Sequence, residues 1–515
     1  MPESVDQRFA QGRCLLSGTP PTAKSLPDIG RDNGKRPTMH AVDDQSSISS
    51  LPLRWRNRWA ERPDQIVLYA EEQWLNGAES DKRTHEIAMR LASNGVRPGD
   101  RVVWEAESSV EGVIGALSVL RLGAVLVPVN VRQSDLERAT VLDEVGASFL
   151  LGAPRTNHDE TIPWTFKSSL DQEKESLPSL DEARLDDLAL IIFTSGTTGK
   201  PKGAMITHGN LAAQADALAE AWGWTLDDRL LSALPLFHVH GLVVSLFTSL
   251  AQGGSIVVKE RFEANDFLAA IKKMEITMCF CVPTMLHRMI DTPDVGVLAQ
   301  IRLVVSGSAP LAQSLHERYQ AHGISILERY GMTESLLTLS NPLVGERRPG
   351  TVGLPLPGVV ADLPEKDDGE QELRIKGPGV FAGYWNLPDA TAEVFDDGWL
   401  KTGDIVRVDS QGYVVVCGRS KELIITGGFN VYPSEVEDLL NVQASIVDSA
   451  VVGMPDDEWG EVVIGYVVVR EGFKESIVLA ALSEVLSSYK IPRRLIVEQS
   501  LPRNALGKLQ RHLLT

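Results

Sequence analysis

The stretch FTSGTTGKPKGAMITHGN occupies residues 193–210 and decides how the rest of the chain is interpreted. The hydrophobic run LALIIFTS at its start predicts a buried strand that ends in a loop rich in glycine, hydroxyl groups and lysine. Glycine lets backbone N–H groups approach an anion closely, and hydroxyl and ammonium groups add donors. The loop therefore predicts a polyphosphate site, although it lacks the GxxxxGK[ST] pattern of a Walker A loop.

Outward from this loop, strand-like and helix-like segments alternate. The sequence predicts helices in LPLRWRNRWAERP (51–63) and VEGVIGALSVLRLG (110–123), and strands in RVVWEAES, AVLVPVN, GSIVVKE, ITMCFCVP and IRLVVSGSA. This alternation is typical of an α/β fold with largely parallel sheets covered on both faces. After about residue 350 the segments become short and turn-rich, which favours a small barrel or twisted sheet.

Three regions are expected. Residues 1–49 are polar and read as a disordered extension, residues 50–419 as a large N-terminal domain, and residues 420–515 as a small, mobile α+β domain. The large domain is expected to consist of parallel αβ-layered sheets with the small β-barrel-like subdomain.

The composition excludes several functions. A net charge of −19 and a pI near 5.1 argue against nucleic acid as the main partner. The sequence contains no run of about 20 apolar residues, the length that a membrane-spanning helix needs. The four cysteines do not suggest a disulfide framework, and alternation places Cys279 and Cys281 on one face of a buried strand. We expect a cytoplasmic protein, since acidic residues in the extension disfavour organelle targeting; monomer and dimer stay open.

The chain resembles the adenylate-forming superfamily of acyl-CoA synthetases, non-ribosomal peptide adenylation domains and luciferases. TSGTTGKPKG (194–203) is that family's signature, and further motifs follow in the family's order. They are YGMTE (330–334), KTGDI (401–405), GRSKELIITGGFNVYPSEVE (418–437) and PRNALGK (502–508). The resemblance covers about residues 50–515.

The resemblance implies a fold of that family, ATP as substrate and a role for each motif. Lys508 would stabilise the charge that develops when a carboxylate attacks the α-phosphate. Glu334 and Thr194 would hold Mg²⁺, which prefers one or two carboxylates together with phosphates and water. The expected ATP-binding residues are Thr194, Ser195, Gly196, Thr197, Thr198, Gly199, Lys200, Lys202, Ser308, Ala309, Pro310, Glu328, Arg329, Tyr330, Gly331, Met332, Thr333, Asp404, Arg419 and Lys508.

The same resemblance implies a second half-reaction with coenzyme A. The C-terminal domain would rotate about Lys421 and bring the loop with Gly427, Gly428 and Phe429 to the substrate tunnel.

PLFHVHGL, VPTMLHR, SGSAPL and LERYGMTES are similar to the malonyl-CoA synthetase branch. His238, Arg288, Ser308 and Met332 are the expected acyl-pocket residues, and His238 with His240 is not expected to bind zinc. A second carboxylate would need a cation, for which Arg288 is the first candidate, ahead of Arg261 and Arg329.

The function predicted from the sequence is an acid–CoA ligase for malonate. Methylmalonate or another short or medium acid, a stand-alone module that loads a carrier protein, and a non-catalytic nucleotide-binding relative are the alternatives. No carrier domain follows Lys508, which disfavours a modular assembly-line protein. Intact Lys508, Glu334, Asp404 and Arg419 disfavour a non-catalytic relative.

Overall fold

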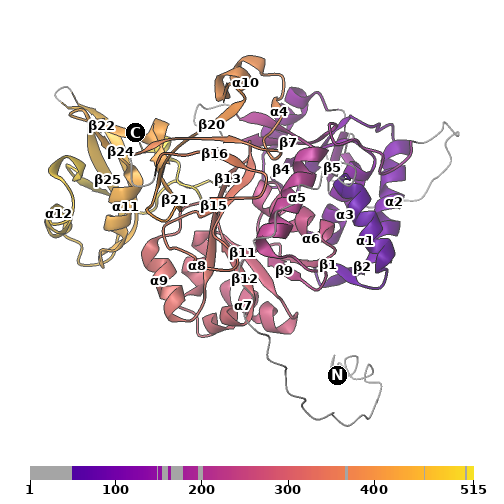
Figure 1. Cartoon of the computed structure of the whole chain (residues 1–515), viewed down its shortest axis with the longest axis horizontal. Helices are drawn as coiled ribbons and strands as arrows, with labels where there is room; N and C mark the ends of the chain where they lie inside the picture. The colour runs from indigo at the N-terminus through magenta and orange to yellow at the C-terminus, as the bar shows by residue number, and fades with distance from the viewer. Residues whose placement is uncertain are drawn as a thin grey trace, which may run out of the picture. The chain divides into compact units, whose positions relative to one another are not determined.

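Two mixed β-sheets form the body of the computed structural model, which describes residues 49–147, 149–152, 161–163, 178–194, 201–365, 369–456, 459–504 and 507–514 (Figure 1). Over these residues the first sheet has nine strands. Six neighbours, from β13 to β1, run parallel, and β2, β14 and β15 add antiparallel edges. In spatial order the strands are β15 (Leu354–Pro355), β14 (Leu336–Ser340), β13 (Ile326–Met332), β12 (Leu303–Ser306), β11 (Met278–Cys281), β9 (Arg229–Ser232), β10 (Ser255–Val258), β1 (Ile66–Ala70) and β2 (Gln73–Asn76).

The second sheet contains the strand that precedes the phosphate loop. Its parallel part ends at β7, and β8 and β18 continue it antiparallel. In spatial order the strands are β18 (Gly383–Tyr384), β8 (Lys202–Thr207), β7 (Leu188–Thr194), β4 (Val125–Val129), β3 (Arg101–Glu105), β5 (Phe149–Gly152) and β6 (Thr161–Pro163).

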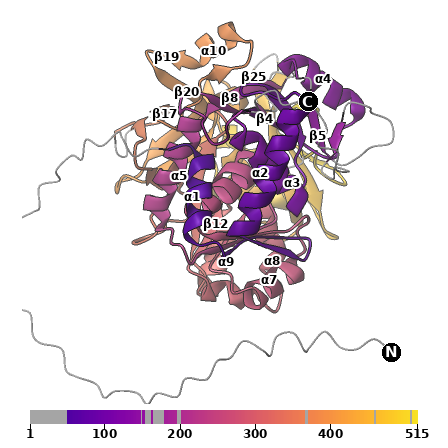
Figure 2. The same cartoon turned by 90° about the vertical axis from the view of Figure 1, so that its right-hand side faces the viewer.

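One layer of helices serves both sheets. Helices α2, α3 and α6 contact β1 or β10 of the first sheet, whereas α3 and α5 contact β3, β4 or β8 of the second. Figure 2 shows α1, α2 and α3 side by side. The layer comprises α1 (Leu51–Glu61), α2 (Gly77–Ser93), α3 (Val110–Arg121), α5 (His208–Trp222) and α6 (Thr248–Ala251). Trp55, Trp104 and Trp222 are fully buried here, so both sheets share one large apolar core.

Further helices flank the sheets. Helix α4 (Asp135–Val145) contacts β3, and α9 (Gln313–Ala321) contacts β13. The others are α7 (Ala264–Lys273), α8 (Pro283–Met289), a π-helix at His240–Phe247 and a 3₁₀ turn at Val295–Gln300.

A small antiparallel sheet follows the body. It contains β16 (Val360–Asp362), β17 (Gln371–Lys376), β20 (Trp399–Val408), β19 (Phe395–Asp396) and β21 (Val414–Arg419), with α10 (Pro388–Val394) beside it. Its strands form a sheet in the region where a barrel or twisted sheet was predicted.

The C-terminal unit has its own sheet and its own small apolar clusters. The strands are β23 (Phe429–Val431), β22 (Ile424–Thr426), β25 (Gly460–Val469), β24 (Ile446–Asp456) and β26 (Leu495–Val497). Helices α11 (Pro433–Asn441) and α12 (Glu475–Ser483) and short turns at Ser420–Glu422, Ser488–Lys490 and Arg511–Leu513 complete it.

The expected α/β class and the α+β C-terminal unit are confirmed. Cys279 and Cys281 are buried in β11 as predicted. The antiparallel edges were not foreseen, because strand-like runs alone do not state direction. Among the described residues, no helix is both long and apolar enough to cross a membrane. Residues 1–48, which include nearly all of the expected extension, lie outside the described part.

Candidate active site

The two ends of the phosphate loop are held together by a β-ladder. Thr194 ends β7, Lys202 begins β8, and the two residues are register partners. The Thr194 hydroxyl lies 3.4 Å from the Lys202 carbonyl oxygen, to which it donates. The loop residues between them, Ser195, Gly196, Thr197, Thr198, Gly199 and Lys200, lie outside the described residues. The ladder thus brings a hydroxyl and an ammonium group to one place from positions eight residues apart.

Three predicted nucleotide contacts meet between the first sheet and the small sheet. The Tyr330 hydroxyl donates to Oδ2 of Asp404 at 2.5 Å, and Nε of Arg419 lies 3.0 Å from Oδ1. Asp404 and Arg419 are register partners on β20 and β21, so the sheet itself sets their spacing. Burial raises the pKa of Tyr330 well above its ordinary value, and the Asp404 charge adds to this. The phenol therefore stays a donor to the buried carboxylate.

Alternation along β13 separates two functions. Side chains at successive strand positions point to opposite faces, so Tyr330 and Arg329 face different neighbours. Arg329 lies over the backbone of Gly307, where an added Cβ would sit 2.3 Å from its guanidinium carbon. A larger residue at 307 would therefore require the Arg329 guanidinium to move.

Arg329 is a buried cation without a counter-ion among the described residues. It is 6% exposed, and its Nε and Nη2 atoms have no hydrogen-bond partner there. Burial alone lowers its pKa to about 9. Removing a charge from water costs several kcal/mol unless a partner compensates. This guanidinium is therefore suited to receive an anion.

His240 lies close enough to Arg329 for that charge to act on its ring, and His238 and Ser308 lie near His240. The Nδ1 atom of His240 is 3.1 Å from the Ser308 hydroxyl, and its buried Nε2 has no partner among the described residues. Burial lowers the pKa of His240 well below its ordinary value, helped by the charges of Arg329 and His238. Burial and the Lys508 charge lower the pKa of His238 to about 3. Both rings are neutral at physiological pH, so the positive charge of this wall belongs to Arg329.

His240 is the first residue of a π-helix, which the sequence analysis did not predict. The Ser245 hydroxyl donates to the His240 carbonyl oxygen at 2.7 Å. Thr248 makes the same type of bond five residues back, to Val243. π-Helical segments are rare and often lie at functional sites. Hydroxyl residues after FHVHG are the only sequence signal, and it is a weak one.

The other predicted arginines lie at the surface. Arg288 is exposed on α8, one turn beyond Thr284, so the two share a helix face. Thr284 neighbours Gly507 of the lysine motif, which places this face toward Lys508. Arg261 is also exposed and lies 3.3 Å from Glu260. Arg288 is thus at the rim of the site, whereas Arg329 is part of its inner wall.

Glu328 and the segment after β12 have a supporting place. Glu328 is buried and 2.9 Å from Nδ1 of His316. Burial raises its pKa, although His316 and the backbone N–H groups of Gly350 and Leu311 oppose this. Its carboxylate is therefore engaged with the protein. Of the other predicted residues, Ala309 and Pro310 are exposed, and Gly331, Met332 and Thr333 are partly buried at the end of β13 and just after it.

Lys508 reaches the same region from the C-terminal unit. Desolvation lowers the pKa of Lys508, and the positive charges of Arg419 and Arg329 lower it further. The negative charges of Asp404 and Glu334 act in the opposite direction. A ring of hydrogen bonds shapes its loop: the Asn504 side chain accepts from the Lys508 N–H at 3.0 Å. Charged residues distant in the sequence thus lie close enough to Lys508 to shift its pKa.

Glu334 fits a magnesium ligand. It is 7% exposed, and its Oε1 accepts a hydrogen bond from Tyr384 at 2.8 Å. Among the described residues, no cluster of three or more His, Cys, Asp or Glu side chains could hold a metal. One buried carboxylate suits Mg²⁺, which takes its remaining ligands from phosphates and water.

The predicted coenzyme A loop is a tight turn in the C-terminal unit. Gly427 and Gly428 have φ of 56° and 83° between β22 and β23, a conformation that favours glycine. Phe429 is 54% exposed and stacks on Tyr489, with ring centroids 4.6 Å apart. The predicted hinge, Lys421, is exposed in the short turn that follows β21.

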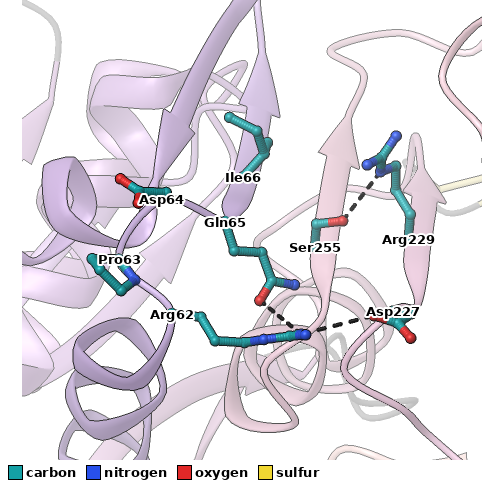
Figure 3. A pocket seen from close by; sticks show the side chains of 8 residues that line it. All are labelled: Arg62, Pro63, Asp64, Gln65, Ile66, Asp227, Arg229 and Ser255. Atoms are coloured by element: carbon teal, nitrogen blue, oxygen red, sulfur yellow. Dashed lines mark hydrogen bonds and ion pairs between the residues drawn. The ribbon is translucent and has the colours of Figure 1, made fainter. Parts of the chain in front are cut away.

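A surface pocket of about 630 Å³ lies at the amino ends of neighbouring strands of the first sheet (Figure 3). Ile66, Arg229 and Ser255 in its lining begin three parallel strands, whereas the site described above lies beyond the strands' carboxyl ends. Arg229 bonds to Ser255, and Arg62 bonds to Gln65. The pocket is separate from the candidate active site.

Comparison with known proteins agrees with this geometry. The model of the AMP-binding enzymes matches residues 55–385, and that of the AMP-binding enzyme C-terminal domain matches residues 435–508. The chain belongs to the AMP-binding enzyme family. The expected class, an acid–thiol ligase, is confirmed with it.

Relatives within the family differ in the acid they use. A feruloyl-CoA synthase from Amycolatopsis sp. is 35% identical, over 84% of this chain and 92% of its own length. A malonate–CoA ligase from Arabidopsis thaliana is 34% identical, over 86% and 81%. The ATP-bound crystal structure of MatB from Rhodopseudomonas palustris has a TM-score of 0.83 and 34% identity, and the match covers 90% of this chain and 98% of MatB. These matches establish the family. They do not identify the acid, because relatives of similar identity are named for different acids.

Proposed function

We propose that this enzyme is a malonate–CoA ligase. Malonate and ATP would give malonyl-AMP and pyrophosphate, and coenzyme A would then displace AMP to give malonyl-CoA. The observation that carries the choice of acid is the buried guanidinium of Arg329, which has no counter-ion among the described residues.

A dicarboxylate resolves the cost of that buried charge. One carboxylate attacks the α-phosphate, and the distal carboxylate pairs with Arg329, so an uncompensated cation becomes a desolvated ion pair. The neutral His240 ring and the Ser308 hydroxyl provide further polar contacts beside it. A long apolar acid would instead leave the guanidinium unpaired.

The remaining groups divide the first half-reaction between them. Tyr330, Asp404 and Arg419 bind the adenosine part, and Lys508 stabilises the charge that develops on the α-phosphate. Thr194 and Glu334 would hold Mg²⁺, which, when bound, neutralises phosphate charge.

For the second half-reaction, the C-terminal unit turns about Lys421. The turn with Gly427, Gly428 and Phe429 then meets coenzyme A.

A substrate panel tests the proposal. The full chain is given ATP and Mg²⁺ with malonate, methylmalonate, acetate, octanoate, benzoate or ferulate, each with and without coenzyme A, and AMP and thioester are quantified. We expect kcat/KM for malonate to exceed that for each monocarboxylate at least tenfold. A monocarboxylate that exceeds malonate tenfold overturns the dicarboxylate assignment.

Two further outcomes of the panel identify the alternatives. Adenylate formation without any consumption of coenzyme A would favour a module that loads a carrier protein. Equal rates with malonate and methylmalonate would widen the substrate to both. They would mean that the pocket does not use the extra methyl group, which can give about 1–3 kcal/mol of discrimination.

A further inference from the structure

Glu334 is held by a segment that the predicted motifs do not include. Its backbone carbonyl accepts from the Phe381 N–H at 2.8 Å, and its Oε1 accepts from the Tyr384 hydroxyl at 2.8 Å. Both Glu334 and Tyr384 are 7% exposed. The short stretch from Phe381 to Tyr384 therefore fixes this glutamate at its backbone and at one carboxylate oxygen.

Tyr384 is itself rigidly placed. It lies on β18, in register with Ala204 on β8, and its ring meets that of Phe381 edge to face with centroids 4.9 Å apart. A buried neutral phenol beside a carboxylate can only donate.

The ring of Tyr384 also contacts the phosphate-loop strand. The ammonium nitrogen of Lys202 lies 5.1 Å from the ring centroid, a cation–π distance. Lys202 is the first residue of β8, directly after the loop. One side chain thus connects the end of the phosphate loop to the glutamate of the YGMTE motif.

We propose that Tyr384 is a positioning residue for the metal–nucleotide complex. Its hydroxyl fixes Oε1 of Glu334 and leaves Oε2 for the cation that accompanies the ATP phosphates. This inference rests on the proposed role of Glu334 as a magnesium ligand. Outer partners of metal ligands typically change metal affinity by about 10- to 100-fold when they are removed.

Nucleotide binding tests the inference without catalysis. Binding of ATP to the full chain, in the absence of the acid, is measured by calorimetry with Mg²⁺ and with EDTA, and the readout is the factor by which Mg²⁺ tightens binding. We expect Tyr384→Phe to reduce this factor about tenfold and to leave binding in EDTA unchanged. Because both measurements use the same sample, a loss of folded protein affects them equally.

A matched control and a reference variant make the outcome decisive. Tyr319→Phe removes another buried hydroxyl, which donates to the Leu286 carbonyl at 2.7 Å, and should leave the factor unchanged. Glu334→Gln should reduce the factor at least as much as Tyr384→Phe. If Glu334→Gln loses the effect of Mg²⁺ and Tyr384→Phe keeps it, the positioning role is wrong. If Glu334→Gln keeps it, the proposed role of Glu334 is wrong.

Discussion

The inner wall of the acyl pocket and the lysine loop are built in opposite ways. The inner wall, formed by His240, Ser308 and Arg329, stands on the large sheet and its π-helix; His240 and Arg329 are buried and Ser308 is partly buried. In the lysine loop of the PRNALGK motif, Arg503 and Lys508 lie at the surface of the C-terminal unit, and solvent-exposed hydrogen bonds join Lys508 to Asn504 and Arg503 to Gly507. Under the proposed function, recognition of the acid would be preorganised, whereas the C-terminal unit would bring the ammonium group of Lys508 to the reacting phosphate.

Because the two regions differ in this way, variants in each of them should change different properties of the enzyme. Variants of the inner wall should alter the choice of acid, and variants of the lysine loop should alter the adenylation step alone.

Removal of the lysine should have the largest effect. Lys508→Ala should lower the rate of malonate-dependent ATP–pyrophosphate exchange by about 10²–10³-fold, because a positioned charge at the reacting phosphate is lost. Thioester formation from synthetic malonyl-AMP and coenzyme A should stay within about threefold of wild type, since the proposed function gives Lys508 no part in that step. An equal loss in both half-reactions would contradict the assigned role.

Neutralising the inner wall should have the next largest effect. Arg329→Met should raise KM for malonate by about 10- to 150-fold, as expected for the loss of about 1.5–3 kcal/mol from a charged hydrogen bond. KM for propionate should change little.

Two controls accompany this variant. The stability of Arg329→Met should not fall, because an unpaired buried charge is removed with it. Arg288→Met, at the rim, should have a smaller effect on malonate. The reverse order would transfer the carboxylate to Arg288, the first candidate from the sequence.

A surface ion pair should tune the lysine loop. Arg503 contacts both carboxylate oxygens of Asp448 at 2.8 Å and donates to the Gly507 carbonyl, also at 2.8 Å. Its side chain is 34% exposed, so the pair is worth about 0.2–1 kcal/mol. Asp448→Asn should slow adenylation about two- to fivefold and spare thioester formation. Equal slowing of both steps would show a general loss of structure.

The pH dependence should show the smallest change. Incomplete hydration and the charges of Arg419 and Arg329 lower the pKa of Lys508 from 10.5, so its ammonium form is lost at a lower pH than for an ordinary lysine. The adenylation rate should therefore fall as pH rises through that lowered pKa, while the thioester step should not. In Lys508→Arg, whose guanidinium keeps its proton, the residual rate should lack this fall.

The sequence predicted the fold class and many of its elements, whereas the surroundings of Arg329 depend on contacts that form only in the folded chain. Hydrophobic runs located β7, β11 and α1, because this signal is short in range, and local motifs supplied the expected nucleotide residues. The burial of Arg329 depends on Gly307 and His240, which approach it only in the folded sheet. The sequence favoured Arg288 because it ends the VPTMLHR motif, and motif position carries no information on burial.

Tyr384 illustrates the same limit. Its contact with Glu334 joins residues fifty positions apart across two sheets, and no periodicity encodes that. Antiparallel pairing at the sheet edges was missed for a similar reason, since a strand's direction depends on its connection.

A crystal structure of the enzyme with a non-hydrolysable malonyl-adenylate analogue tests the central claim most directly. We predict that the distal carboxylate lies within about 3 Å of the Arg329 guanidinium, the distance of a charged hydrogen bond. A distal carboxylate that lies in solvent or against Arg288, with Arg329 still unpaired, would contradict the account.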